Sequence, residues 1–207
     1  MDSTSKVRFC GLTISFDDRV LTPRPWTEAQ SLWAAELLAA APAGPVLELC
    51  SGVGHIGLGA VRDSQRQLVM VDLNPVAQQF AAANAAANGL ASRVEFRLAP
   101  MKEALGDEER FVLIVADPPW VRTAETSMFP QDPLVAIDGG EDGLSLARTC
   151  VDLINHHLDE GGSALLQVGS TAQAALISAH AEKLPPGSVT VVQARAFEGG
   201  VIVRLAR

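Results

Sequence analysis

Hydrophobic residues along the chain alternate between short continuous runs and stripes with helical spacing. Runs typical of strands occupy residues 46–49, 67–73, 93–98, 110–116, 162–169, 189–195 and 200–206, and helices are expected between them. Such alternation predicts a mainly parallel sheet with helices on both faces. Only Phe197-Glu-Gly-Gly200 joins the last two runs, so these strands should pair antiparallel. We therefore expect an α/β fold, a doubly wound, seven-stranded, mostly parallel sheet with an antiparallel end.

Two predicted helices have a clear apolar stripe, and we expect both stripes to face the core. The first helix begins behind Pro75 and should end at a left-handed cap at Asn88-Gly89. Its stripe is Val76, Phe80, Ala83 and Ala87. The second stripe is Leu144, Ala147, Val151, Ile154 and Leu158, after which Gly161-Gly162 should open a strand.

Residues 1–26 are predicted to be a lead-in to the main domain. Val7–Leu21 alternates loosely around the turn residues Gly11 and Asp17-Asp18, which favours a β-hairpin. Two prolines keep the next residues extended, and Thr27 is a candidate N-cap for a helix over Glu28–Ala41. The sequence has no linker, repeat or low-complexity tract, so residues 1–207 should form one domain.

Composition narrows the possible functions. Phe111–Ala116 is far too short an apolar run to span a membrane, and Met1–Lys6 has no signal pattern. The three cysteines have no paired or metal-type spacing, which favours reduced thiols in a cytoplasm and no metal site. A formal charge of −8 argues against a nucleic acid partner. The oligomeric state stays open.

A strand followed by a glycine turn predicts a nucleoside site. Val46–Leu49 precedes Gly52, Gly54 and Gly57 in the spacing G-x-G-x-x-G, which lets backbone N–H groups approach a ligand. The next strand ends at Asp72, 18 residues beyond Gly54, where a carboxylate can bind ribose hydroxyls. A helix-capping role for Asp72 is the alternative. The spacing alone leaves the choice of nucleoside cofactor open.

Glu48 favours a cationic cofactor over a dinucleotide. A carboxylate just before the glycine turn would repel a pyrophosphate, as in NAD, and attract the ammonium of S-adenosyl-L-methionine. The alternative is a strand-end acid that accepts hydrogen bonds from loop amides.

Asp117-Pro118-Pro119-Trp120 is the candidate catalytic motif, because it ends the most apolar strand. Its two prolines lack N–H donors, so their carbonyls are freed from the sheet ladder. The Asp117 carboxylate and the Pro118 carbonyl could each accept an N–H from a planar nitrogen group on which Trp120 stacks. Catalysis would then consist of positioning and electrostatic support for charge on nitrogen. A simple turn after a buried strand is the alternative.

These motifs resemble the class I S-adenosylmethionine-dependent methyltransferases, and among them the HemK-like group that methylates glutamine in release factors. The likeness spans nearly the whole chain, including Leu21-x-Pro-Arg-Pro-x-Thr-Glu28, Val71-Asp-Leu-Asn-Pro75, Asn84-x-x-x-Asn88-Gly-Leu90 and Asp138-Gly-Gly-Glu-Asp-Gly-Leu144. It implies a substrate site near Arg24, Trp26, Thr27 and Trp120. It also implies cofactor contacts from Glu48, Cys50, Ser51, Gly52, Gly54, Asp72, Leu73, Asn74, Pro100, Met101 and Asp117.

The chain departs from this group in three places. The group motif is Asn-Pro-Pro-Tyr, whereas Asp117 and Trp120 stand here, and ionised Asp only accepts hydrogen bonds. Aspartate at this place also resembles enzymes that methylate exocyclic base amines. Pro100 replaces an acidic residue that the group has after the third strand. The group's N-terminal helical domain has no counterpart ahead of Val7.

These observations predict a cytoplasmic N-methyltransferase that acts on an amide or amine nitrogen of a small molecule, peptide or protein side chain. Because both apolar stripes are assigned to the core, we expect no exposed apolar docking surface. A small acceptor or short peptide is therefore favoured over an intact release factor, with Arg24 free for the acceptor's carboxylate. Glutamine methylation of a protein is the alternative, and a non-catalytic nucleoside-binding subunit is a second.

Overall fold

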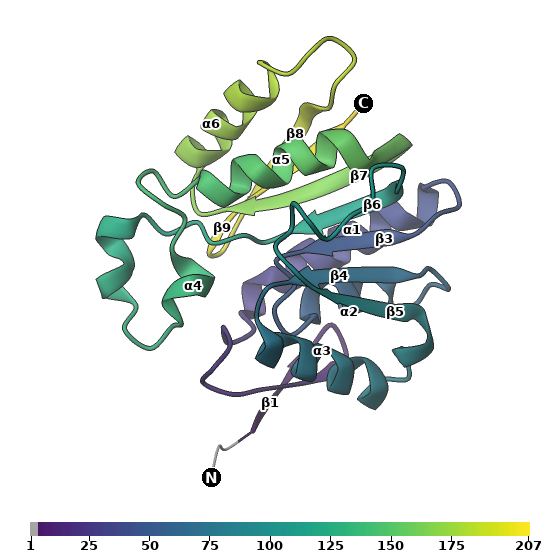
Figure 1. Cartoon of the computed structure of the whole chain (residues 1–207), viewed down its shortest axis with the longest axis vertical. Helices are drawn as coiled ribbons and strands as arrows, with labels where there is room; N and C mark the ends of the chain where they lie inside the picture. Colours follow the sequence, from purple (N-terminus) through teal and green to yellow (C-terminus); the bar gives the residue numbers. More distant parts are fainter. Residues whose placement is uncertain (1–3) are drawn as a thin grey trace.

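A seven-stranded sheet forms the centre of the chain, whose computed structural model describes residues 4–207 (Figure 1). Predictions for residues 1–3, including part of the expected signal-free N-terminus, lie outside the described residues. The strands are β3 (Val46–Leu49), β4 (Leu68–Asp72), β5 (Val94–Leu98), β6 (Phe111–Ala116), β7 (Leu158–Val168), β8 (Thr190–Phe197) and β9 (Gly200–Ala206). Their order in the sheet is β5-β4-β3-β6-β7-β9-β8.

The sheet is parallel from β5 to β7 and antiparallel at the β9-β8 end, as predicted. From β3 the chain runs outward through β4 and β5 and then returns to place β6 on the other side of β3. Strand order therefore reverses between β3 and β6. In open α/β sheets, ligands bind outside the carboxyl ends of the strands at such a point.

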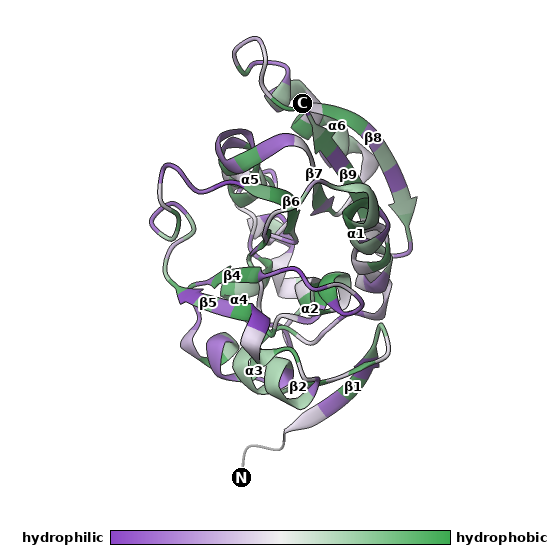
Figure 2. Cartoon of the chain, turned by 90° about the vertical axis from the view of Figure 1, so that its right-hand side faces the viewer, coloured by the Kyte–Doolittle hydropathy of each residue, from purple (hydrophilic) through white to green (hydrophobic). Residues whose placement is uncertain are grey.

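Helices cover both faces because strand residues alternate between two cores. One core joins the sheet to α1 (Glu28–Ala40), α2 (His55–Val61) and α3 (Pro75–Ala87). The other joins it to α5 (Ser145–His157) and α6 (Thr171–Ala181). Figure 2 shows that hydrophobic residues concentrate in the central strands between these layers. Shorter elements are η1 (Pro25–Thr27), η2 (Ala91–Arg93), η3 (Thr123–Met128) and α4 (Leu134–Ile137).

Some details of the helices and strands were predicted wrongly. Only turns connect β5 to β6, where a helix was expected. The strand expected to open at Gly161-Gly162 begins at Leu158, and its pairing with β6 shifts register in between. The buried face of α3 is Ala77, Ala81, Asn84 and Ala85, while Ala83 and Ala87 are exposed. By contrast, the predicted stripe of Leu144, Ala147, Val151, Ile154 and Leu158 is fully buried.

Asn84 is buried on α3 because it holds the N-terminal hairpin, formed by β1 (Ser5–Phe9) and β2 (Leu12–Phe16). Its side chain accepts from the Ser15 N–H at 2.7 Å and donates to the Ser15 carbonyl at 3.1 Å. One turn later, Asn88 forms the same pair of bonds with Thr13, at 3.1 and 2.9 Å. Two carboxamides thus replace a neighbouring strand and fix the hairpin beside α3 (Figure 1).

Thr27 precedes α1 as predicted, but its side chain does not cap the helix. The 3-10 turn η1 places Thr27 in a helical conformation, and its hydroxyl donates to the Arg24 carbonyl at 2.8 Å. None of the helices within residues 4–207 is long and apolar enough to cross a membrane.

Candidate active site

The loop from β3 to α2 lies at the reversal of strand order and is held by Asp72. Cys50, Gly52 and Gly54 have positive φ angles of 56°, 50° and 79°, which turn the chain sharply. The two Asp72 oxygens accept the Gly52 N–H at 2.7 Å and the Asn74 N–H at 2.9 Å. A carboxylate has about four acceptor positions, so Asp72 retains capacity for ligand hydroxyls.

Glu48 is buried beneath the same loop and does not reach the cavity wall. Burial raises the pKa of Glu48 to about 8, although the Gly57 N–H opposes this shift, and the nearby Asp72 and Asp117 carboxylates raise it further. One Glu48 oxygen, Oε2, is buried without a hydrogen-bond partner. Glu48 therefore makes no direct contact with a ligand in the cavity. Its predicted role would be electrostatic, acting on a bound cation across the glycine loop.

A cavity of about 480 Å³ opens in front of the loop. Its wall includes most of the predicted cofactor residues: Cys50, Ser51, Gly52, Asp72, Leu73, Asn74, Pro100, Met101 and Asp117. Among the predicted site residues, Glu48, Gly54, Pro118, Trp120, Arg24, Trp26 and Thr27 do not line it, while Pro119 does. The structure therefore brings most of the predicted cofactor residues together but leaves all four predicted substrate residues outside this cavity.

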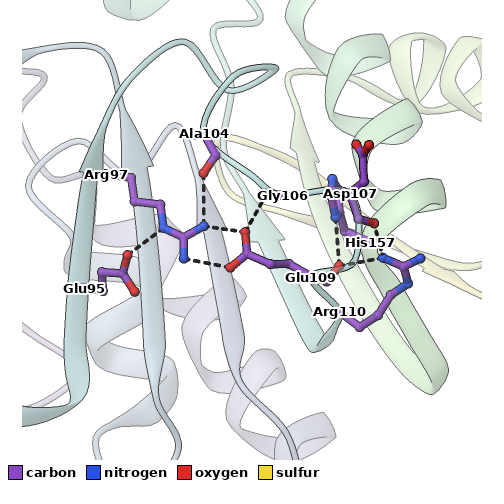
Figure 3. Close-up of polar contacts among 8 residues, drawn as sticks. All are labelled: Glu95, Arg97, Ala104, Gly106, Asp107, Glu109, Arg110 and His157. Carbon is purple, nitrogen blue, oxygen red and sulfur yellow. Dashed lines mark hydrogen bonds and ion pairs between the residues drawn. The ribbon is translucent and has the colours of Figure 1, made fainter.

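An ion-pair network orders the chain that directly follows the wall residues Pro100–Glu103 (Figure 3). Arg97 on β5 makes a bidentate pair with Glu109, at 2.7 and 2.8 Å, and also donates to Glu95 at 2.8 Å and to the Ala104 carbonyl at 3.0 Å. Glu109 in turn accepts the Gly106 N–H at 2.7 Å. These bonds order the turns that replace a helix between β5 and β6.

Asp117 is half-buried at the end of β6, where its environment disfavours a negative charge. Burial raises the pKa of Asp117 to about 7, and hydrogen bonding from the Trp120 side chain opposes the shift. Asp117 is therefore present in both protonation states near neutral pH. The protonated carboxyl offers one donor and one acceptor, as an asparagine side chain does.

Trp120 does not line the cavity, although its side chain hydrogen-bonds to Asp117, which does. A Cβ added to Gly169 would come within 2.4 Å of the Trp120 ring, so the ring lies against the chain that follows β7. Gln173 on α6 donates to the Trp120 carbonyl at 2.9 Å. The predicted stacking of Trp120 on an acceptor would have to use the ring face left free by this packing.

The backbone of the Asp138–Leu144 loop packs against the backbone of the Asp117–Trp120 motif. A Cβ at Gly139 would lie 2.7 Å from the Pro119 carbonyl, and one at Gly143 would lie 2.4 Å from the Trp120 carbonyl. Side chains at these two positions would therefore push the motif out of place. The two sequence motifs act as one unit because their backbones touch.

Arg24 is not free for an acceptor's carboxylate, contrary to expectation. Its guanidinium pairs with the Asp132 carboxylate at 2.5 Å, and Asp132 is nearly buried there. Trp26 packs against Gly199 in the turn between β8 and β9. This segment therefore braces the chain around the site in this structure.

Sequence reasoning missed several residues of the cavity. His55, Val135, Ala136, Ser145, Leu146 and Thr149 line it. His55 directly follows Gly54 of the predicted loop, so its neighbours could have indicated it. Ser145, Leu146 and Thr149 lie on the less buried side of α5, and no periodic pattern marks that side as functional. The Thr27 hydroxyl lies 3.3 Å from His55 Nε2, and burial lowers the pKa of His55 to about 4.

The site fits a nucleoside ligand that carries positive charge. Glu48, Asp72 and Asp117 lie close enough for the latter two to shift the pKa of Glu48. Among the described residues, Lys102 is the only lysine or arginine of the wall, so a pyrophosphate would have little to bind. Ser51 Oγ is buried on this wall without a hydrogen-bond partner. Within residues 4–207, no cluster of histidine, cysteine and acidic side chains could hold a metal ion.

Comparison with known proteins agrees with this geometry. Over 168 residues the chain is 35% identical to a release factor glutamine methyltransferase of Geobacter sulfurreducens, covering 78% of this chain and 57% of the relative. It thus spans about three fifths of the length of the curated relatives that it matches.

Solved structures share the fold. The catalytic domain of hMettl16, in complex with a MAT2A 3'UTR hairpin, superposes with a TM-score of 0.75 at 14% identity, over 95% of this chain and 75% of that one. An RNA methyltransferase from Salinibacter ruber, in complex with S-adenosyl-L-homocysteine, gives 0.53 at 17% identity, over 88% and 90%. The model of the methyltransferase small domain matches residues 28–136. The chain belongs to the methyltransferase small domain family.

Proposed function

We propose that this chain is an S-adenosyl-L-methionine-dependent methyltransferase that acts on a side-chain nitrogen of a protein, with glutamine as the candidate residue. The observation that carries the proposal is the position of Asp117 on the wall of a cavity that also presents Asp72 and the glycine loop. The choice of glutamine rests on the similarity to the release factor glutamine methyltransferase of Geobacter sulfurreducens.

Asp72 would hold the ribose hydroxyls, and the wall at Pro100 and Met101 would border the adenine. The carboxylates would favour the ammonium and the sulfonium, and the bound cofactor would supply an electrophilic methyl group. The acceptor nitrogen would form a bond to the methyl carbon as the carbon–sulfur bond breaks, with the electron pair left on sulfur and a proton lost from nitrogen.

Asp117 would orient this nitrogen. When protonated, it can accept the N–H and donate to the carbonyl of a carboxamide, which restores the pairing available to asparagine. When ionised, it can only accept, which suits an amine. An amine nitrogen is therefore the second candidate acceptor, favoured by the aspartate at this position.

Calorimetry tests the cofactor assignment. S-adenosyl-L-methionine and S-adenosyl-L-homocysteine should bind, and NAD should not. Asp72→Ala should weaken binding by about 1–3 kcal/mol because hydroxyls and loop amides lose a charged acceptor. Asp72→Asn, which keeps one acceptor oxygen, is the milder control. Tight NAD binding, or unchanged affinity in Asp72→Ala, would contradict the assignment.

A labelled-methyl assay tests the role of Asp117. Asp117→Ala should slow transfer by roughly two orders of magnitude or more and change cofactor affinity much less than that. Full activity of Asp117→Ala would remove this residue from the mechanism.

A further inference from the structure

The segment from Arg122 to Ile137, here called the rim segment, exposes apolar side chains beside the cavity. Met128, Leu134 and Val135 are 71%, 59% and 57% exposed. The sequence pattern did not reveal these exposed side chains, because they have no helical or strand periodicity. In Figure 1 this segment projects from the body of the molecule around α4. Contiguous exposed apolar residues commonly mark interaction sites.

The rim segment is anchored at its base and its tip. The Val121 N–H donates to the Ile137 carbonyl at 3.0 Å, and the Gly139 N–H donates to the Val121 carbonyl at 2.8 Å. The Thr123 hydroxyl donates to Asp138 at 2.7 Å. Near the tip, Asp132 pairs with Arg24. The apolar side chains are thus presented by a segment that is fixed to the domain.

The same segment forms part of the cavity wall. Val135 and Ala136 line the cavity together with Asp117 and Leu73, and Leu73 is itself 56% exposed. An acceptor whose nitrogen reaches Asp117 would therefore meet apolar surface at the entrance. A small ligand inside the cavity would not need Met128, which lies outside the wall.

The charge of this region indicates the chemistry of the partner. Between residues 122 and 142 the chain has one basic residue, Arg122, against five carboxylates: Glu125, Asp132, Asp138, Glu141 and Asp142. Arg24 and Arg148 pair with Asp132 and Asp142, and Arg122 pairs with Glu125 at 3.6 Å. Among the described residues, the carboxylates of this stretch without an arginine partner are therefore Asp138 and the exposed Glu141. Such a surface attracts basic groups and repels phosphates.

We infer that the rim segment docks a loop of the acceptor protein that combines apolar and basic side chains and presents its target nitrogen to Asp117. This inference rests on the proposed function and adds the surface through which a protein is selected. Apolar contacts with Met128 and Leu134 would contribute affinity, and the carboxylates would orient the basic loop.

The test measures binding of a folded, full-length bacterial release factor to the chain saturated with S-adenosyl-L-homocysteine. Met128→Ser/Leu134→Ser should weaken binding at least tenfold and leave affinity for S-adenosyl-L-homocysteine unchanged. The matched control is Leu176→Ser/Val192→Ser, because these side chains are similarly exposed, at 47% and 52%, on α6 and β8. Glu125→Gln/Glu141→Gln should weaken binding and reduce its dependence on salt.

Equal binding by the Met128→Ser/Leu134→Ser variant and the unchanged chain would overturn the inference. So would an unchanged chain that binds S-adenosyl-L-homocysteine but not the release factor, or one that binds an RNA hairpin through the rim segment. Failure of the proposed function gives a different result, since S-adenosyl-L-homocysteine itself would then not bind.

Discussion

The carboxylate of Glu48 lies directly against Gly57: a Cβ at position 57 would come within 2.3 Å of Glu48 Oε2. The last glycine of the G-x-G-x-x-G spacing is therefore needed because it leaves room for the Glu48 side chain, and not because the chain turns there. Gly57 belongs to the regular helix α2, and Glu48 ends up buried between this helix and its own strand.

Gly57→Ala should destabilise the chain by about 1–3 kcal/mol, because overpacking outweighs the better helix propensity of alanine. The measurement is urea unfolding of four proteins: the unchanged chain, Gly57→Ala, Glu48→Ala and the double variant. If the two side chains collide, the cost of Gly57→Ala should fall in the Glu48→Ala background. Additive effects of the two substitutions would show that contact with Glu48 is not the reason why alanine is unfavourable at position 57.

Binding of S-adenosyl-L-methionine at pH 7 should release protons. Glu48 has a pKa of about 8 and Asp117 of about 7, so both are partly or largely protonated before binding. A nearby positive charge stabilises the ionised form of each group and lowers its pKa. Calorimetry in buffers with different ionisation enthalpies measures the number of protons released.

S-adenosyl-L-homocysteine provides the matched control, since it lacks the sulfonium charge and should release fewer protons. Glu48→Gln should reduce release with both ligands. A binding enthalpy that does not depend on the buffer would show that these carboxyls do not sense the ligand.

The Arg97–Glu109 pair should make the free energy of unfolding depend on pH. Arg97 holds the pKa of Glu109 at about 2, below its ordinary value of 4.5. A lowered pKa stabilises the fold at higher pH, and this contribution is lost as pH falls from about 4.5 toward 2. Glu109→Gln should cost about 1 kcal/mol at pH 7, because the pair is partly exposed, and much less at pH 2.

Unfolding by urea at both pH values checks this prediction. Asp63→Asn removes an exposed carboxylate from its pair with Arg62 and should destabilise the chain less than Glu109→Gln does. Because Glu109 also orders the wall at Pro100, Glu109→Gln should weaken cofactor binding as well. Equal losses for the two variants at pH 7 would contradict a special role of Glu109.

The sheet was predictable from the sequence because its signals are local. The run Phe111–Ala116 and the glycine turn at Gly52 specify strand, turn and helix from neighbouring residues, and the carboxyl ends of parallel strands necessarily meet at one edge. That rule placed Glu48, Asp72 and Asp117 at one edge of the sheet, whereas the resemblance to class I methyltransferases implied Leu73, Pro100 and Met101. The stripe from Leu144 to Leu158 was equally clear because every member packs against the sheet.

Contacts between distant segments were not predictable. Arg24 looked free because its partner, Asp132, is 108 residues away. The buried face of α3 includes Asn84, and not Ala83 and Ala87 as predicted, because Asn84 bonds to the hairpin at Ser15, 69 residues earlier. No sequence pattern showed that the Trp120 ring lies against Gly169 or that Gln173 on α6 donates to the Trp120 carbonyl. Each of these depends on tertiary packing that periodicity does not encode.

The pH dependence of transfer should reveal which nitrogen Asp117 orients. Burial raises the pKa of Asp117 to about 7, and hydrogen bonding from the Trp120 side chain opposes this rise. If the acceptor is a carboxamide, the protonated form is active because it donates to the carbonyl. The rate should then fall as pH rises through about 7. If the acceptor is an amine, the ionised form is active, and the rate should rise over the same range.

Asp117→Asn separates these cases, because asparagine keeps the donor and acceptor pair at every pH. With a carboxamide acceptor, this variant should lose the decline near pH 7 and exceed the unchanged chain at pH 8. With an amine acceptor, it should be slower throughout, since the neutral side chain gives less support to positive charge on nitrogen. The measurement is single-turnover transfer of labelled methyl from pH 5.5 to 8.5 with saturating cofactor. A profile that is identical for Asp and Asn would show that the charge of residue 117 has no part in choosing the acceptor.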